Sequence, residues 1–184
     1  MKSAVINRIA IFCGSGTGSD PAFRKVCIDT AEILHSHRIG LVYGGGNIGL
    51  MGILADELLK LGGEVTGVIP QKLVDIEVVH HGLTHLHIVP GMHERKALMT
   101  RLSDAFLILP GGIGTMDEFF EVFTWFQLGY HHKPVALLNT NGFYNNLISL
   151  LENMVQQGFL KQDRYDQLII GVEVAELLDR IIKF

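Results

Sequence analysis

The stretch Ala105-Phe106-Leu107-Ile108-Leu109-Pro110-Gly111-Gly112-Ile113-Gly114-Thr115-Met116-Asp117-Glu118 decides how this chain folds. Its first five residues are apolar, which predicts a buried strand, and residues 119–126 after it predict a helix. A strand, a glycine-rich turn and a helix N-terminus together form an anion-binding site, because backbone N–H groups and the helix dipole face the same point. The glycines let these N–H groups come close to a phosphate, and Thr115 adds a hydroxyl. We therefore predict a phosphate site on Gly111, Gly112, Gly114 and Thr115.

Glu118 is the unexpected residue in this stretch, because a site that only binds phosphate gains nothing from a carboxylate one turn into the helix. One interpretation is a capping box, in which Thr115 bonds a backbone amide of the first turn and Glu118 reaches back to the cap. A capping box does not explain the three glycines before it. The other interpretation is that Glu118 takes part in the chemistry of the site.

Apolar runs and helical patterns alternate along the whole chain. The helices are expected at residues 21–35, about 50–61, 92–102 and 174–182. The strands are expected at residues 9–13, 40–43, 64–69, 85–89, 105–109, 134–138 and 168–170. The stretch 71–83 shows no clear pattern, and we interpret it as a loop that could form a lid.

Continuous apolar strands separated by amphipathic helices predict a parallel sheet that is covered on both faces. The fold class is α/β, a Rossmann-like doubly wound parallel sheet of about seven strands with helices on both faces. At 184 residues, the chain is expected to form a single Rossmann-like nucleotide-binding domain over residues 1–184. Ligands of such sheets bind outside the carboxyl ends of the strands.

Two further strands end in glycine clusters that are expected at the same edge of the sheet as the first. Gly14 and Ser15 follow the first strand, and Gly44-Gly45-Gly46 follow the second. The second cluster fits the GxGxxG pattern of dinucleotide sites, but the ribose-binding acidic residue is absent from the end of the next strand, because Glu64 stands at its start. A dinucleotide cofactor is therefore disfavoured. These glycines could bind substrate, or they could serve only close helix–strand packing.

The segment Met92-His93-Glu94-Arg95-Lys96 opens the helix after the fourth strand, again at a carboxyl end. Cations near a helix N-terminus are unfavourable unless an anion compensates them. Glu94, Glu118 or a bound phosphate could be that anion, whereas Arg95 and Lys96 could also be ordinary solvated charges.

Composition excludes several other classes of function. The net charge is −4 and Lys and Arg form no run, so we expect no nucleic-acid partner. No apolar run approaches the roughly 20 residues that cross a bilayer, and the N-terminus lacks the layout of a signal peptide. Cys13 and Cys27 are too few for a disulfide framework, which favours free thiols in a cytoplasmic protein. His85 and His87 lack further ligands at suitable spacing, so no metal is expected.

Taken together, the motif Pro110–Glu118 and the pair Arg95-Lys96 make this chain resemble the Lonely Guy (LOG) family, whose signature is PGGxGTxxE with an upstream Arg-Lys pair. The resemblance extends over most of the chain, from the turn after Cys13 to residues 124–129 and 133–135. One departure is Gly91, where an acidic residue often precedes the Met-His pair, and this puts in doubt how the base or ribose is held there.

The resemblance implies a phosphoribohydrolase that releases adenine or an N6-modified adenine (a cytokinin) from a nucleoside 5′-monophosphate, without a cofactor, as a homodimer. It implies that Glu118 and Arg95 are catalytic. Glu118 would stabilise the positive charge that develops on the sugar and orient a water. The residues expected to bind substrate are Gly14, Ser15, Gly44, Gly45, Gly46, Met92, Lys96, Gly111, Gly112, Gly114 and Thr115.

Two other functions are compatible with such a pocket. A nucleotide or cofactor carrier or sensor would bind the same ligand without turnover. A pyridoxal-phosphate lysine decarboxylase, an old label in this family, would need a Schiff-base lysine and a partner for the pyridine nitrogen. Lys96 is the one lysine near the inferred site, and no such partner is evident.

Overall fold

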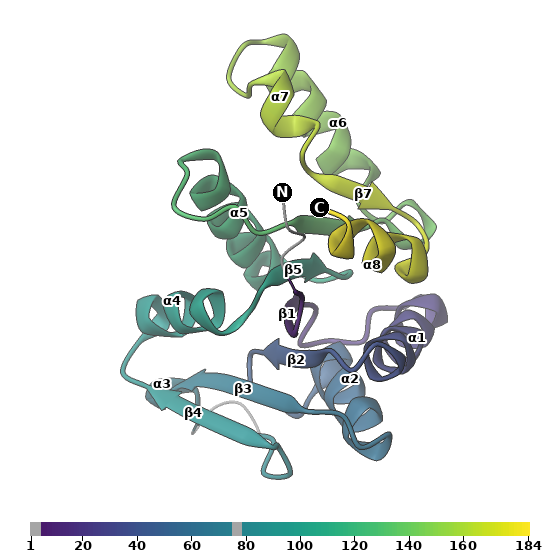
Figure 1. The fold of residues 1–184 in the computed structure, drawn as a ribbon, viewed down its shortest axis with the longest axis vertical. Coiled ribbons are helices and arrows are strands. Elements are labelled where there is room, and N and C mark those ends of the chain that lie inside the picture. The colour runs from purple at the N-terminus through teal and green to yellow at the C-terminus, as the bar shows by residue number, and fades with distance from the viewer. Residues whose placement is uncertain (1–4, 75–78) are drawn as a thin grey trace.

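The computed structural model describes residues 5–74 and 79–184, and these form a single sheet with helices on both sides (Figure 1). The strands are β1 (Arg8–Phe12), β2 (Gly40–Tyr43), β3 (Val65–Pro70), β4 (His85–Val89), β5 (Ala105–Ile108), β6 (Val135–Leu138) and β7 (Ile169–Gly171). The helices are α1 (Pro21–Ser36), α2 (Gly49–Lys60), α3 (Gln71–Val74), α4 (Met92–Leu102), α5 (Ile113–Gln127), α6 (Asn145–Gln156), α7 (Gln162–Tyr165) and α8 (Val174–Ile182), with a 3-10 turn η1 (Thr140–Gly142). Within the described residues, no helix is both long and apolar enough to span a bilayer.

The strand order is β4-β3-β2-β1-β5-β6-β7, and every pairing is parallel. The chain builds outward from β1 through β2, β3 and β4, then returns to the other side of β1 with β5. In register, Ile9 of β1 lies between Leu41 of β2 and Ala105 of β5. This reversal of direction between β1 and β5 creates a crevice at their carboxyl ends, where ligands of open α/β sheets bind.

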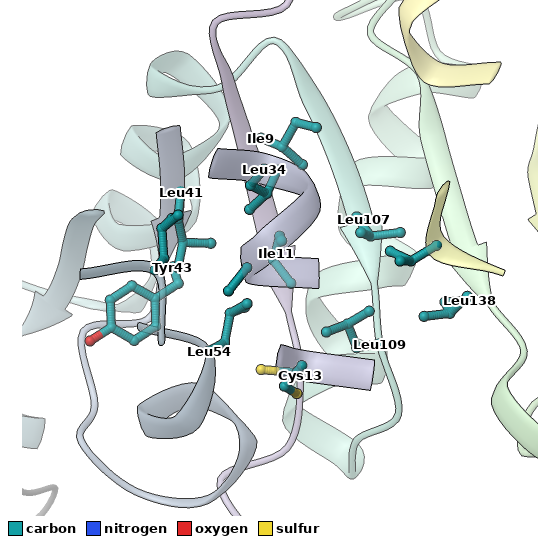
Figure 2. Packing of buried hydrophobic residues seen from close by; sticks show 14 of the residues in the cluster. Ile9, Ile11, Cys13, Leu34, Leu41, Tyr43, Leu54, Leu107, Leu109 and Leu138 are labelled. Atoms are coloured by element: carbon teal, nitrogen blue, oxygen red, sulfur yellow. The ribbon is translucent and has the colours of Figure 1, made fainter. Parts of the chain in front are cut away.

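Successive residues of β1 belong to two separate cores, one on each face of the sheet. Ile9 and Ile11 pack in the core that α1, α2 and α8 cover, and part of this core is drawn in Figure 2. Ala10 and Phe12 pack on the other face, against side chains of α4, α5 and α6. Figure 1 shows α1 and α2 to the right of the sheet and α4 and α5 to its left. Alternating side chains on a strand buried on both faces explain why its sequence is apolar throughout.

The predicted fold class is confirmed, and each predicted strand lies within one residue of the observed one. Apolar runs mark buried parallel strands well, because both faces need apolar side chains. Residues 71–74 form the short helix α3 where a loop was expected, and the part of the possible lid at 75–78 lies outside the described residues. No pattern predicted η1, α6 or α7.

Tyr144 ties the start of α6 to the end of β5. Its phenol is buried and donates a hydrogen bond to the carbonyl oxygen of Leu109 at 2.7 Å. The backbone N–H of Tyr144 donates to Oδ1 of Asn139 at 2.7 Å. Leu109 directly precedes Pro110, so these bonds fix the point at which the glycine turn leaves the sheet. Burial raises the pKa of Tyr144, which keeps the phenol protonated as a donor.

The hydroxyl of Tyr43, at the end of β2, differs from that of Tyr144 because it has no hydrogen-bond partner among the described residues. The Tyr43 side chain is fully buried. Figure 2 shows this hydroxyl pointing away from the surrounding apolar side chains. A buried hydroxyl without a partner costs free energy that a phenylalanine at the same position would not.

We expect the same substitution to act in opposite ways at these two tyrosines. Tyr144→Phe should lower the free energy of unfolding by about 1–2 kcal/mol, because it leaves the Leu109 carbonyl unsatisfied. Tyr43→Phe should leave that free energy unchanged or raise it. Urea unfolding of both variants beside the wild type measures the difference, and equal losses in the two would contradict the assignment.

Candidate active site

A cavity of about 180 Å³ lies at the carboxyl ends of β1 and β5, between the N-termini of α4 and α5. Its walls are formed by Cys13, Ser15, Met51, Met92, Arg95, Lys96, Gly112, Ile113, Gly114, Thr115, Asp117 and Glu118. Eight of the residues predicted for the site therefore line one cavity, although they come from three separate parts of the sequence.

The turns after β1 and β5 touch each other through their backbones. The N–H of Gly14 donates to the carbonyl oxygen of Pro110 at 3.1 Å. A Cβ on Gly111 would come within 2.9 Å of the Gly14 nitrogen and 2.1 Å of Thr115 Oγ1. No larger residue fits there without displacing the turn. Gly14 and Gly111, two of the glycines predicted to bind substrate, thus make the approach of the two turns possible, and they border a neighbouring cavity.

The N-terminus of α2 packs against the same turn. Gly49 has a φ of +61°, and a Cβ on it would lie 2.2 Å from the carbonyl oxygen of Ser15. The N–H of Leu50 donates to the carbonyl oxygen of Gly14 at 3.0 Å. The last glycine of the GxGxxG pattern therefore serves close packing of the helix on the loop.

Helix α5 begins at Ile113 with Gly112 as its N-cap, and no side chain caps its first turn. Thr115 is the third helical residue and is buried, and Glu118 is the sixth. The capping-box interpretation is wrong, because it requires Thr115 at the N-cap position. An uncapped N-terminus that opens into a cavity presents its amide groups and the positive end of its dipole to a ligand.

Arg95 is held almost entirely inside the protein, with 7% of its surface exposed. Its Nε donates to the carbonyl oxygen of Val68 at 3.1 Å, and its Nη2 donates to the carbonyl oxygen of Gly44 at 3.2 Å. Val68 lies within β3, two residues before its end, and Gly44 directly follows β2. The fourth residue of α4 thus reaches back over the edge of the sheet, and its position is fixed by backbone rather than by flexible side chains.

Gly44, Gly45 and Gly46 were predicted to bind substrate, but they are not among the residues that line the cavity. A Cβ on Gly44 would come within 2.1 Å of Arg95 Nη2. Gly45 has a φ of +81°, where an L-amino acid is strained. In the structure, Gly44 makes room for the guanidinium that reaches the cavity.

Glu118 faces Arg95 across the cavity, with 4.0 Å between Oε1 of Glu118 and Nη2 of Arg95. Their side chains are 15% and 8% exposed, respectively. A charge pair at this depth interacts far more strongly than one in water, and each partner compensates the burial of the other.

Cys13 lies in the wall of the same cavity and remains a neutral thiol. Its pKa is raised well above the ordinary value, first by burial and then by the neighbouring Cys27 and Glu118. A protonated thiol is a poor nucleophile. Cys13 is therefore not expected to act as a nucleophile in this cavity.

Lys96 points its ammonium at two carboxylates of α5. Its Nζ lies 3.0 Å from Oδ2 of Asp117 and 2.5 Å from Oε2 of Glu121, and its side chain is 15% exposed. Burial lowers the pKa of Lys96, but the hydrogen bonds with Glu121 and Asp117 outweigh burial and raise it above 10.5. Lys96 was expected to neutralise phosphate. The structure shows it joining α4 to α5 on either side of Glu118.

Cys13, Met51, Ile113 and Asp117 line the cavity but were not predicted to do so. Cys13, Ile113 and Asp117 are each adjacent in sequence to a predicted site residue, so proximity to the carboxyl edge was the available signal for them. Met51 lies five residues beyond Gly46, in the first turns of α2, and had no such signal. Within residues 5–74 and 79–184, no three His, Cys, Asp or Glu side chains gather so that they could hold a metal ion.

The Lys96 bridge generates a stability prediction. Lys96→Met should lower the free energy of unfolding by about 1–3 kcal/mol, because it leaves two carboxylates of α5 without their cation. The pKa of Lys96 is raised by folding, so its contribution is complete below pH 10.5 and is lost as the pH rises through the folded value. Urea unfolding at neutral and alkaline pH checks this. The free energy of unfolding should fall as the pH is raised, and it should fall less in the variant than in the wild type.

Lys25→Met is the matched control, because Lys25 also pairs with a carboxylate, Asp29, but on the exposed face of α1. This variant should change stability little. Equal effects at both lysines would show that the Lys96 bridge adds nothing beyond a surface ion pair.

Comparison with known proteins places this geometry in a family. Residues 51–181 match the model of a family described as "possible lysine decarboxylase". A cytokinin riboside 5′-monophosphate phosphoribohydrolase of Rhodococcoides fascians is 45% identical over 167 residues, which cover 90% of this chain and 84% of that protein. An Arabidopsis thaliana protein of the same name is 45% identical over 177 residues, covering 96% of this chain and 82% of that protein.

Solved structures share the fold at much lower identity. The molybdenum cofactor carrier protein of Chlamydomonas reinhardtii superposes with a TM-score of 0.71 at 15% identity, over 96% of both chains. A molybdenum cofactor binding protein of Rippkaea orientalis gives a TM-score of 0.71 at 22% identity, over 98% of both chains. The high identity over most of their length to the phosphoribohydrolases shows that the chain belongs to the family described as possible lysine decarboxylase, the LOG family that its sequence resembles.

Proposed function

We propose that this protein is an N-glycosidase of nucleoside 5′-monophosphates, a phosphoribohydrolase that releases free adenine or an N6-modified adenine and ribose 5-phosphate. The observation that carries the proposal is the buried pair of Glu118 and Arg95 in the same cavity as the uncapped N-terminus of α5. The curated relatives named as cytokinin riboside 5′-monophosphate phosphoribohydrolases support it.

The 5′-phosphate binds at the start of α5. Gly112 and Gly114 have no heavy atom within 4 Å of a Cβ position, so the backbone there is open to a ligand. The amides of this turn and the helix dipole compensate the phosphate charge, and Ser15 closes the site from the opposite turn. With Lys96 occupied by Asp117 and Glu121, the cradle depends on backbone more than on side-chain cations.

Glu118 acts on the other end of the sugar phosphate. It lies five residues beyond Ile113, or about 7–8 Å along the helix axis, a separation that a ribose can bridge. When the bond between C1′ and the base nitrogen breaks, positive charge develops on the ribose ring. A carboxylate fixed beside C1′ stabilises that charge and orients the water that attacks C1′.

Arg95 sets the state and place of Glu118. Its carbonyl partners at Val68 and Gly44 hold the guanidinium rigidly, so its charge is in place before substrate arrives. Such preorganisation is what makes electrostatic stabilisation of a transition state effective. Met92, whose Sδ lies 3.5 Å from Nη1 of Arg95, lines the cavity on the side open to a base.

Pyridoxal-phosphate chemistry does not fit these residues. A Schiff base requires a deprotonated lysine amine, whereas Lys96 is bound by two carboxylates and its pKa is raised. The description of the family as possible lysine decarboxylases therefore finds no support in the geometry of this chain.

Several features of the proposed enzyme rest on the family resemblance and composition. They are a single nucleotide-binding domain, a homodimer, a cytoplasmic location and the absence of a nucleic-acid partner. The exposed apolar residues Leu86 and Ile88 on the edge strand β4 are compatible with an interface between subunits.

The reaction is tested by incubating the purified protein with AMP and with an N6-isopentenyl analogue, and by separating the products. Free base and ribose 5-phosphate are expected. Glu118→Gln and Arg95→Ala should each lower kcat by roughly 10²–10⁴-fold, because one removes the carboxylate charge and the other removes the cation that favours it.

Asp117→Asn is the control, because it changes the adjacent carboxylate, whose side chain is 55% exposed. Its kcat should stay within about tenfold of the wild type, since exposed ion pairs contribute little. Full activity of Glu118→Gln would refute the mechanism. Stable binding of intact AMP without products would favour a carrier.

The homodimer is tested by measuring molar mass in solution. Light scattering after size exclusion should give about twice the 20.4 kDa of one chain. Leu86→Lys with Ile88→Lys should shift the mass toward the monomer if β4 is in the interface, because charges are costly in an apolar contact. A wild-type mass of one chain would refute the dimer.

A further inference from the structure

A second cavity, of about 320 Å³, lies beside the active-site cavity. The two share Ser15 and Gly112, so the phosphate-binding turns form a ridge between them. The proposed function uses only one side of this ridge. The second cavity therefore has no assigned role, although it is the larger of the two.

The second cavity differs from the first in chemistry. Its side-chain walls include Phe23, Leu50 and Phe143, and none of the described residues that line it is charged. Phe23 and Phe143 meet edge to face with 5.4 Å between ring centroids. The remaining wall is glycine-rich backbone. Such a surface suits a flat, uncharged group and offers no cation for a further phosphate.

The position of the ridge determines how such a group would be attached, given the proposed function. A phosphate on the amides of Gly112 and Gly114 is joined to the ribose on the side of Glu118. Phosphorus is tetrahedral, so its other oxygens point away from the ribose. Because Ser15 and Gly112 line both cavities, a phosphate bound there lies next to the second cavity, and a group on one of these oxygens can enter it.

We propose that the second cavity binds an uncharged aromatic group esterified to the 5′-phosphate, so that the protein also acts on phosphodiesters of adenosine 5′-monophosphate. In this reaction water adds to C1′, the bond from C1′ to the base nitrogen breaks, and the base leaves with a proton. Both ester bonds to phosphorus stay intact, so the products are adenine and the aromatic ester of ribose 5-phosphate.

Gly16 offers a way to close this cavity alone. It lines the second cavity and not the first, and a Cβ on it would meet no heavy atom within 4 Å. Its φ is outside the left-handed region, so a larger residue is sterically allowed. Gly16→Leu should fill the cavity. Phe143→Ala should instead remove part of its aromatic wall without filling it.

The test compares AMP with its 5′-phenyl ester as substrates of the wild type and both variants, after circular dichroism has confirmed folding. The wild type should release adenine from both compounds. Both variants should lower kcat/KM for the phenyl ester by roughly tenfold or more, as loss of a fitted apolar contact does, while kcat/KM for AMP stays within about twofold.

Three results would overturn the proposal while leaving the proposed function standing. In the first, the wild type cleaves AMP but neither cleaves nor binds the phenyl ester. In the second, Gly16→Leu lowers kcat/KM equally for both substrates. In the third, neither variant lowers kcat/KM for the ester. If AMP itself is not cleaved, the proposed function fails. Calorimetric titration of the ester into the wild type and into Gly16→Leu then tests the second cavity by itself. Binding to the wild type that Gly16→Leu abolishes would support the proposal. No binding to the wild type, or unchanged binding to Gly16→Leu, would refute it.

Discussion

The backbone contact between the turns after β1 and β5 is the constraint on which the rest of the site depends. The bond from Gly14 to Pro110 joins two turns that are almost a hundred residues apart in sequence. It places the start of α5 against the end of β1, at the point where the sheet reverses its order of construction. Tyr144 fixes the same strand end from the other side through Leu109. With these contacts in place, the cavity has a rigid floor before any side chain is considered.

The two cations of the cavity, Arg95 and Lys96, bind different partners. Arg95 is bound by two backbone carbonyls and faces Glu118. Lys96, its neighbour in sequence, is instead paired with Asp117 and Glu121 of α5. Adjacent cations on one helix thus have different partners, and of the two only Arg95 is paired with Glu118. The separation matters because a cation shared between phosphate and carboxylate would serve both less well.

The sequence alone predicts most of the fold, since buried parallel strands require apolar runs and helices require helical spacing. It also predicts the strand-end clustering of Ser15, Arg95, Glu118 and the glycine turn of α5. It could not distinguish a capping role of Glu118 from a catalytic one, because both use the same spacing. Backbone geometry excludes the capping box, because Gly112 rather than Thr115 is the N-cap, and the catalytic role of Glu118 stays a prediction.

The sequence also could not predict which groups the charged side chains would pair with. Lys96 and Asp117 are 21 residues apart and meet only through the packing of α4 against α5. Gly44 looked like a ligand-binding glycine, yet its lack of a side chain admits a guanidinium from a helix 51 residues away. Such long-range steric requirements leave no periodic pattern in the local sequence. The second cavity, lined by Phe23, Leu50 and Phe143, left none either.

A site built from close backbone contacts is damaged by added atoms more than by lost ones. At Gly44, Gly49 and Gly111, a single methyl group would come within 2.2 Å of a neighbouring atom. Evolution of a different substrate preference is therefore channelled away from these positions. It is directed toward the exposed rim, where Ile113, which is 87% exposed, can change size without disturbing these turns. The fold thus places closely packed glycine turns, which admit no added atom, beside an exposed rim that can accept one.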